Sequence, residues 1–285
     1  MKKIILILGL IIFGTTAFGA CDDLKCPEPY DLTSSTSQFF SRITGQRLLS
    51  EKIGERLLKK TIQKNITKGH VKTDITSYST RDLKAGRFKS ATITGKNISV
   101  QGVDISYFQA RTLCDFNYIA EGKDGDVIIK ENMPLQIKIV MTEDDINNTM
   151  NSSDYKRLIG NINNIGGNFN IFNIESADVK IKDNKLHYIV KYSIPFVRKS
   201  KEISMSADLK VENGQIKFAN TTLDKNSFSL DVDKFSKILN YINPLDFTAK
   251  VLENRDAKFN IQHVDIVEDK VTVEGRVTIL KDKEL

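Results

Sequence analysis

The first long pattern in the chain is a repeat of apolar positions between residues 37 and 69. Apolar side chains four residues apart line up along one side of an α-helix. The repeating positions are Leu49, Ile53, Leu57, Leu58, Ile62 and Ile66. Ser37 can cap the start of this helix, and Gly69 follows the last repeating position. The segment therefore predicts one long amphipathic helix.

From Val71 onward the period of apolar positions changes from four to two, which is the spacing of residues on one face of a strand. The clearest strand is KLHYIVKYSIPFV, residues 185–197. Six apolar side chains share one face of it: Leu186, Tyr188, Val190, Tyr192, Ile194 and Phe196. Three dipeptides that favour tight turns separate alternating runs and predict hairpins: Asp183-Asn184, Asn213-Gly214 and Glu268-Asp269.

Two short segments interrupt the strands. In TEDDINNTM, residues 142–150, the acids Glu143, Asp144 and Asp145 are candidates for a metal or acid–base site. We interpret them instead as a helix start, because Thr142 and Asp145 have capping-box spacing and acids favour the first helical turn. The run VDKFSKILNYINPLDF, residues 232–247, predicts another short helix that ends near Pro244.

These elements predict an α+β fold in which hairpins, and not βαβ crossovers, build the sheets. We expect a long amphipathic N-terminal helix and curved antiparallel meander sheets that wrap around helices. Residues 36–285 would form a single domain made of two sheet halves. A helix need not fill the whole concave face of such a sheet, so an elongated apolar groove can remain.

The start of the chain resembles a bacterial export signal. Lys2 and Lys3 precede an apolar run from Ile4 to Phe13, and small residues follow. This run is shorter than the roughly 20 apolar residues of a transmembrane helix. We therefore expect residues 1–20 to be a signal peptide, residues 21–35 a tether, and the mature chain to work in the periplasm or on an extracytoplasmic membrane surface.

The three cysteines allow two arrangements. Gly19-Ala20-Cys21 resembles the end of a lipobox, and acylation of Cys21 would leave Cys26 free to bridge Cys114. Alternatively, Cys21 pairs with Cys26 and Cys114 is buried as a small apolar residue.

The net charge of +6 is unevenly distributed. Between Arg42 and Lys72 there are nine Lys or Arg residues and only two acids, Glu51 and Glu55. The polar face of the predicted helix can simply be solvated, or it can meet anionic lipid headgroups. The candidate membrane-facing cations are Arg56, Lys59, Lys60 and Lys64. No nucleic-acid recognition motif accompanies the charge, so we expect no nucleic-acid partner.

An enzyme is not predicted. The sequence has no nucleophile elbow, P-loop, zinc-protease or C-x-x-C motif. The three histidines, His70, His187 and His263, each stand alone in a polar or alternating context. We expect no catalytic residue, metal or cofactor. A hydrolase would instead lose turnover on replacement of His187 or His263.

The order of elements resembles the LmeA-like phospholipid-binding family of bacterial envelope proteins, which is similar to tubular lipid-binding domains. The resemblance covers residues 43–279 and includes SATITGKNISVQGVDI, LQIKIVMTEDDINNTM and FNIQHVDIVEDKVTVEG. It implies phospholipid as the ligand, and the basic face of the predicted helix adds an anionic membrane surface as a partner. It supplies no catalytic residues.

A lipid carrier must shield each acyl CH₂ group from water, at roughly 0.8 kcal/mol per group. The apolar strand face would provide this shield in an apolar groove. The candidate lipid-binding residues are Ile137, Ile139, Tyr188, Val190, Tyr192, Ile194, Phe196 and Phe218. For each of them, a place in a dry core is the alternative. The rival function is an envelope adaptor that binds another, unidentified protein without a lipid cavity.

Overall fold

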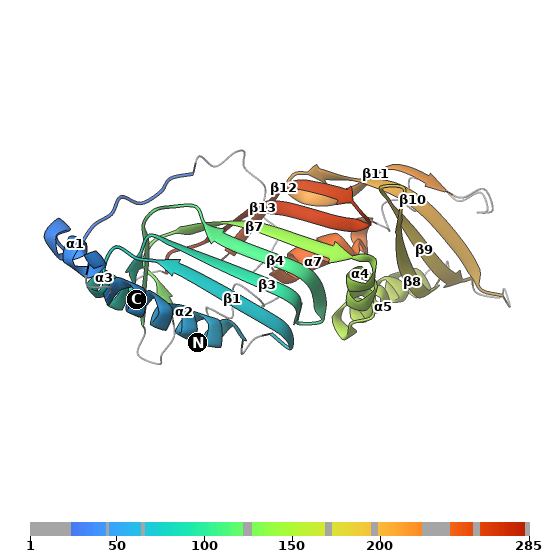
Figure 1. The fold of residues 1–285 in the computed structure, drawn as a ribbon. Coiled ribbons are helices and arrows are strands. Elements are labelled where there is room, and N and C mark those ends of the chain that lie inside the picture. Colours follow the sequence, from blue (N-terminus) through green and yellow to red (C-terminus); the bar gives the residue numbers. More distant parts are fainter. Residues whose placement is uncertain are drawn as a thin grey trace.

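The computed structural model describes residues 24–43, 46–63, 66–121, 127–168, 173–194, 199–223, 240–252 and 257–282. Within these ranges the protein is mainly antiparallel β-sheet, so the predicted α+β class is wrong. The described helices have 5 to 18 residues, and the helix of residues 244–252 packs in the interior against the large sheet (Figure 1). They are α1 (Ser35–Ile43), α2 (Gln46–Gln63), α3 (Thr80–Lys84), α4 (Glu143–Met150), α5 (Ser153–Asn168) and α7 (Pro244–Leu252).

The largest sheet has six strands in the order β1-β3-β4-β7-β13-β12. All neighbouring strands in it are antiparallel. The strands are β1 (Lys68–Thr76), β3 (Ser90–Val100), β4 (Val103–Thr112), β7 (Met133–Thr142), β13 (Lys270–Ile279) and β12 (Ala257–Val267). The C-terminal hairpin thus completes a sheet begun by the first strands, because β13 pairs with β7 over its whole length.

Two smaller sheets accompany it. The four-stranded sheet has the order β11-β10-β9-β8, and the three-stranded sheet has the order β2-β5-β6. The four-stranded sheet contains β8 (Asn173–Lys182), β9 (Lys185–Ser193), β10 (Lys201–Glu212) and β11 (Gln215–Leu223). The three-stranded sheet contains β2 (Arg87–Phe88), β5 (Asn117–Glu121) and β6 (Val127–Ile129). In Figure 1 the four-stranded sheet lies at the opposite end of an elongated molecule from α1.

The predicted tight turns are confirmed. Asp183 and Asn184 both have positive φ and connect β8 to β9, and Glu268 and Asp269 do the same between β12 and β13. Two left-handed residues form the hairpin turn whose twist matches that of the flanking strands. The turn residues, and the alternation on either side of them, fix the register of each hairpin.

The predicted long amphipathic helix is wrong, because the segment forms two helices, α1 and α2. Helix α2 lies along the edge strand β1, and its buried side is not purely apolar. Glu51 Oε1 accepts hydrogen bonds from the Ser77 backbone N (2.7 Å) and hydroxyl (2.9 Å), and Glu55 Oε1 accepts one from Ile75 N (3.1 Å). The helix therefore supplies carboxylates where a further strand would supply carbonyl groups.

The predicted helix start at Thr142 is confirmed. The Thr142 hydroxyl accepts a hydrogen bond from Asp145 N, and Asp145 Oδ2 accepts one from Thr142 N at 2.8 Å, which is a capping box. The predicted helix end before Pro244 is confirmed within the described residues, because Asn240 and Tyr241 are helical and the helix stops before Asn243. Pro244 then begins α7, and Asn243 Oδ1 accepts a hydrogen bond from Leu245 N (3.0 Å). Proline is suited to the first position of a helix, where its missing N–H has no partner to lose. Residues 232–239, the first part of that predicted helix, lie outside the described ranges.

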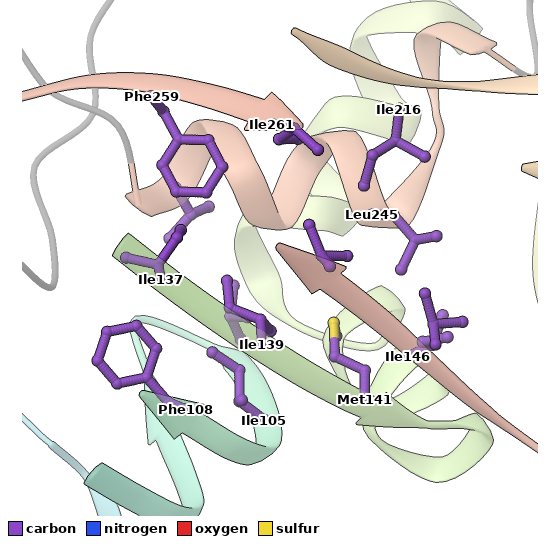
Figure 2. Packing of buried hydrophobic residues seen from close by; sticks show 14 of the residues in the cluster. Ile105, Phe108, Ile137, Ile139, Met141, Ile146, Ile216, Leu245, Phe259 and Ile261 are labelled. Carbon is purple, nitrogen blue, oxygen red and sulfur yellow. The ribbon is translucent and has the colours of Figure 1, made fainter. Parts of the chain in front are cut away.

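A single apolar cluster joins the six-stranded and four-stranded sheets. Figure 2 shows part of it, with side chains from the large sheet, α4, α7 and β11 converging on one interior. The labelled members are Ile105, Phe108, Ile137, Ile139, Met141, Ile146, Ile216, Leu245, Phe259 and Ile261. The two sheets also meet at their backbones, because Ile261 N of β12 donates to Gly214 O of the β10–β11 turn at 3.3 Å. The interior is thus continuous along the molecule.

Candidate functional site

The predicted lipid-binding residues come together in this interior. Ile137 and Ile139 of β7 and Val190 of β9 are all buried members of the apolar cluster. Tyr188 and Phe218 belong to the cluster as well, Tyr192 is buried and Ile194 is partly buried. Phe196 lies outside the described residues. Since these buried side chains pack against other parts of the protein, an acyl chain can reach them only by displacing protein neighbours.

Two tyrosine hydroxyls lie inside the apolar cluster. Tyr188 of β9 donates a hydrogen bond of 2.7 Å to the Tyr155 hydroxyl of α5, which in turn donates to Ile242 O; the Tyr188 hydroxyl lies 3.4 Å from the same carbonyl. Burial raises the pKa of Tyr155 and of Tyr188, because an ionised phenolate would lose its hydration there. The Tyr155 ring also packs edge-to-face on Phe247 of α7, with 5.3 Å between ring centroids. These contacts bind a helix, a strand and the start of α7 together.

The N-terminal segment before α1 is fixed by a disulfide to the connection between β4 and β5. Cys26 and Cys114 are bonded, with 5.4 Å between their Cα atoms and a sequence separation of 88. Cys114 is therefore not a free thiol in this structure. Tyr30 follows and packs on Phe116 with 5.1 Å between ring centroids. Cys21, the predicted lipid anchor, lies outside the described residues.

A buried carboxylate holds the same segment a few residues later. Asp82 of α3 is fully buried and accepts hydrogen bonds from Thr33 N (3.0 Å), the Thr33 hydroxyl (2.7 Å) and the Ser79 hydroxyl (2.6 Å). The Arg87 guanidinium lies 3.8 Å from Asp82 Oδ1 and completes the neutralisation of the charge. We call Thr33, Ser79, Asp82 and Arg87 the clasp. It explains why a segment without secondary structure has a defined place.

Helix α1 presents apolar side chains to solvent, a feature that the sequence reasoning missed. Phe39 is 60% exposed, Ile43 is 65% exposed, and Leu48 at the start of α2 is 60% exposed. The signal is present in SQFFSRI, where Phe39 and Ile43 are four residues apart and thus neighbours on one helix face. The pattern alone could not show that this face points away from the core.

The predicted membrane-facing cations lie beside these residues in the sequence. Arg56 and Lys59 of α2 are exposed, as are Arg42 of α1 and Lys52 of α2, which the prediction did not include. The side chain of Lys60 and the whole of Lys64 lie outside the described parts of the chain. Exposed cations and exposed apolar groups thus meet around the junction of α1 and α2.

The described residues do not assemble a recognisable catalytic or metal centre. His70, His187 and His263 lie on three different strands, β1, β9 and β12. Within the described ranges no three His, Cys, Asp or Glu side chains are grouped as metal ligands. Asp145, one of the candidate acids, is engaged in the capping box. The apolar interior and the junction of α1 and α2 are therefore the features with functional potential.

None of the helices in the described ranges has both the length and the apolar character needed to cross a membrane. The chain matches no family model, no curated protein and no solved structure. The resemblance to LmeA-like proteins therefore stays a prediction.

Proposed function

We propose that the protein is a cell-envelope lipid-binding protein that shields phospholipid acyl chains in its apolar interior, in the service of lipid transport or envelope maintenance. The observation that carries this proposal is the continuity of the apolar cluster. It extends from Ile137 in the six-stranded sheet to Tyr188 and Phe218 in the four-stranded sheet. A path of this kind suits an acyl chain of 16 carbons, which costs on the order of 12 kcal/mol to expose to water.

Entry of a lipid requires one element to move, and α7 is the best candidate. Leu245 and Val251 of α7 are buried in the apolar cluster, and Phe247 packs on Tyr155. Among the described residues, the side chains of α7 form no hydrogen bond or ion pair with either sheet. Asn243, just before α7, donates to Ile216 O at 2.9 Å, and this hydrogen bond can hold the N-terminal end of α7 in place while the rest of the helix moves. Apolar contacts can be exchanged for acyl-chain contacts at little cost, unlike hydrogen bonds.

Export is part of the same proposal. Disulfides persist in oxidising compartments outside the cytoplasm, so the Cys26–Cys114 bond supports a periplasmic or other extracytoplasmic location. An acylated Cys21 would lie only five residues before Cys26. At about 3.5 Å per extended residue, the anchor would hold the disulfide within roughly 18 Å of the membrane.

The test is to export the full chain carrying Cys21→Ser, which removes the acylation site and keeps the disulfide. The protein is purified without detergent and examined by native mass spectrometry, followed by solvent extraction. We expect one phospholipid per protein. A lipid-free mass that persists after incubation with phospholipid vesicles would refute the proposal.

A second candidate, the envelope adaptor, is favoured by the position of β12. It is the last strand of the six-stranded sheet, and Val267 near its end is 53% exposed. An edge strand can pair with a strand from another protein. A lipid-free protein that retains a stoichiometric protein partner would support the adaptor, whereas a lipid-loaded protein without one would support the lipid carrier.

A further inference from the structure

The exposed apolar side chains of this protein are concentrated in one short part of the chain. Among the described residues there are seven large apolar side chains classed as exposed, and five of them lie between residues 24 and 48. These five are Leu24, Tyr30, Phe39, Ile43 and Leu48. Single exposed apolar residues are ordinary on a protein surface, but a local concentration of them marks an interaction surface.

Helix geometry places cations next to Leu48, one member of this apolar group. Leu48, Lys52, Arg56 and Lys59 all lie on the exposed side of α2. At 100° per residue the four positions span about 80° of the helix circumference. We call these four residues, together with Phe39, Arg42 and Ile43 of α1, the docking face. The docking face combines three exposed apolar side chains with four cationic ones.

The two acids of this region do not neutralise the docking face. Glu51 and Glu55 are the only acids between Arg42 and Lys72. Both carboxylates are turned toward β1, where they accept hydrogen bonds from Ser77 N and Ile75 N. Within the described residues, none of the four cations Arg42, Lys52, Arg56 and Lys59 is held in an ion pair. The acids thus serve the fold, and the cations remain available to a partner.

The N-terminal segment is fixed at the same end of the molecule. The Ser41 hydroxyl of α1 lies 3.3 Å from the Thr80 hydroxyl of α3, and Thr33 binds Asp82 of α3 in the clasp. In Figure 1, α1, α3 and the first turns of α2 share one end of the elongated fold. The chain that precedes residue 24, with its apolar run from Ile4 to Phe13, joins the body through this clasped segment.

We propose that the docking face binds the anionic surface of a lipid bilayer, with Phe39, Ile43 and Leu48 entering the headgroup layer and the cations lying over lipid phosphates. Apolar residues beside a basic helical surface are the usual composition of a segment that lies in a membrane interface. The inference takes its setting, the cell envelope, from the proposed function. It does not require a lipid in the interior, and it orients the long axis of the protein away from the membrane.

The test uses the exported full chain carrying Cys21→Ser, so that no acyl anchor contributes. Cosedimentation is measured with vesicles of phosphatidylcholine alone and with vesicles containing 30% phosphatidylglycerol. We expect binding only to the anionic vesicles. Each cation near the surface contributes about fivefold, so the double variant Lys52→Gln/Arg56→Gln should bind on the order of 25-fold more weakly. Ile43→Ser should also reduce binding.

Matched controls come from exposed residues elsewhere in the fold. Lys180→Gln/Lys191→Gln in the four-stranded sheet removes the same charge, and Val267→Ser removes a comparable apolar side chain. Both should leave vesicle binding unchanged. Equal losses in the controls and in the docking-face variants would overturn the proposal, as would the absence of binding to anionic vesicles. Self-association without vesicles that Ile43→Ser abolishes would assign the face to a second copy of the chain and would also overturn it.

The two proposals can fail separately. Native mass spectra of the same preparations report the lipid in the interior, and none of the docking-face variants should change it. A phospholipid adduct without vesicle binding would refute the docking face alone. Vesicle binding by a protein that refuses lipid would refute the lipid-shielding function alone.

Discussion

The hydroxyls of Tyr155 and Tyr188 lie 2.7 Å apart in the apolar interior, and the Tyr155 hydroxyl donates in turn to the carbonyl oxygen of Ile242. Each hydroxyl satisfies a polar group that would otherwise be buried without a partner. This arrangement fixes the distance between α5 and β9 at the point where the apolar cluster passes from one sheet to the other.

Replacement of Tyr155 by Phe should lower the free energy of unfolding by about 1–3 kcal/mol, because it leaves Tyr188 with only its longer contact to Ile242 O at 3.4 Å. Tyr188→Phe should cost less, because the short Tyr155 bond to the carbonyl remains. Urea unfolding of both single variants and of the double variant measures the coupling. Additive effects of the two substitutions would contradict the shared network.

The stability of the protein should fall at alkaline pH. Burial raises the pKa of Tyr155 and Tyr188 above the usual tyrosine value near 10, so the folded state keeps two protons that the unfolded state releases. The stabilisation is complete below about pH 10 and decreases above it, by up to about 1.4 kcal/mol per pH unit for each tyrosine. Unfolding curves between pH 8 and 11.5 measure the slope.

The double variant Tyr155→Phe/Tyr188→Phe is the control for this pH dependence, and it should show a flatter profile. A smaller slope should remain, because burial also raises the pKa of Tyr78 and Tyr192. An unchanged slope in the double variant would show that the buried pair is not its source.

Loss of the disulfide should lower the free energy of unfolding by more than the loss of any single hydrogen bond in the N-terminal segment. The bond closes a chain segment of 88 residues. Loop-closure entropy for that length corresponds to about 4–5 kcal/mol. Cys26→Ser/Cys114→Ser should therefore lower the free energy of unfolding by an amount of this order. Cys21→Ser should have no effect on it, and a similar loss in this variant would contradict the Cys26–Cys114 pairing.

The ion pair of the clasp can be tested by a single substitution with a matched control. Among the described residues, Asp82 is the only buried carboxylate paired with Arg87, so Asp82→Asn leaves a guanidinium that is 13% exposed without its buried partner. We expect the free energy of unfolding to fall by about 3 kcal/mol and the segment before α1 to be cleaved faster by proteases. Asp31→Asn is the control, since Asp31 also lies 3.8 Å from Arg87 but is 75% exposed. Its effect should be within about 0.5 kcal/mol.

Substitution of two glycines by Ala should change the stability of the protein in opposite directions. Gly86 has a φ of +81°, and a Cβ there would lie 1.8 Å from Ile119 O, so Gly86→Ala should cost more than about 2 kcal/mol. Gly160 lies in α5 with nothing within 4 Å of an added Cβ. Gly160→Ala should stabilise the protein by about 0.5–1 kcal/mol. Thermal unfolding of the two variants gives the comparison, and a loss at Gly160 would contradict the helix geometry.

Local patterns predicted local structure well in this chain. The turn at Asp183-Asn184 and the helix start at Thr142 depend on residues within four positions of each other, and both are confirmed. The predicted fold class was wrong because it relied on a long N-terminal helix, and the packing of a helix against the sheets depends on residues that are distant in the sequence. Nothing near Glu51 in the sequence indicates that its carboxylate binds Ser77, which lies beyond the end of β1.

The same limit applies to the candidate sites. Alternation placed Tyr188 and Val190 on an apolar strand face, but it could not show what covers that face. Spacing placed Phe39 and Ile43 on one side of a helix, and it could not show that this side faces solvent. A helix with an apolar stripe normally turns the stripe inward, so only tertiary structure could reveal the exception.

If the chain is exported as proposed, the distance between the two disulfide partners along the chain also sets an order of events during secretion. Cys26 would then emerge from the export channel first, and strands β1 to β4 would follow before Cys114 arrives. In that interval the nearest thiol to Cys26 is Cys21, only five residues away. Acylation of Cys21 would block this thiol and so prevent a Cys21–Cys26 disulfide. A modification usually regarded as a membrane anchor would thus also favour the native disulfide during oxidative folding.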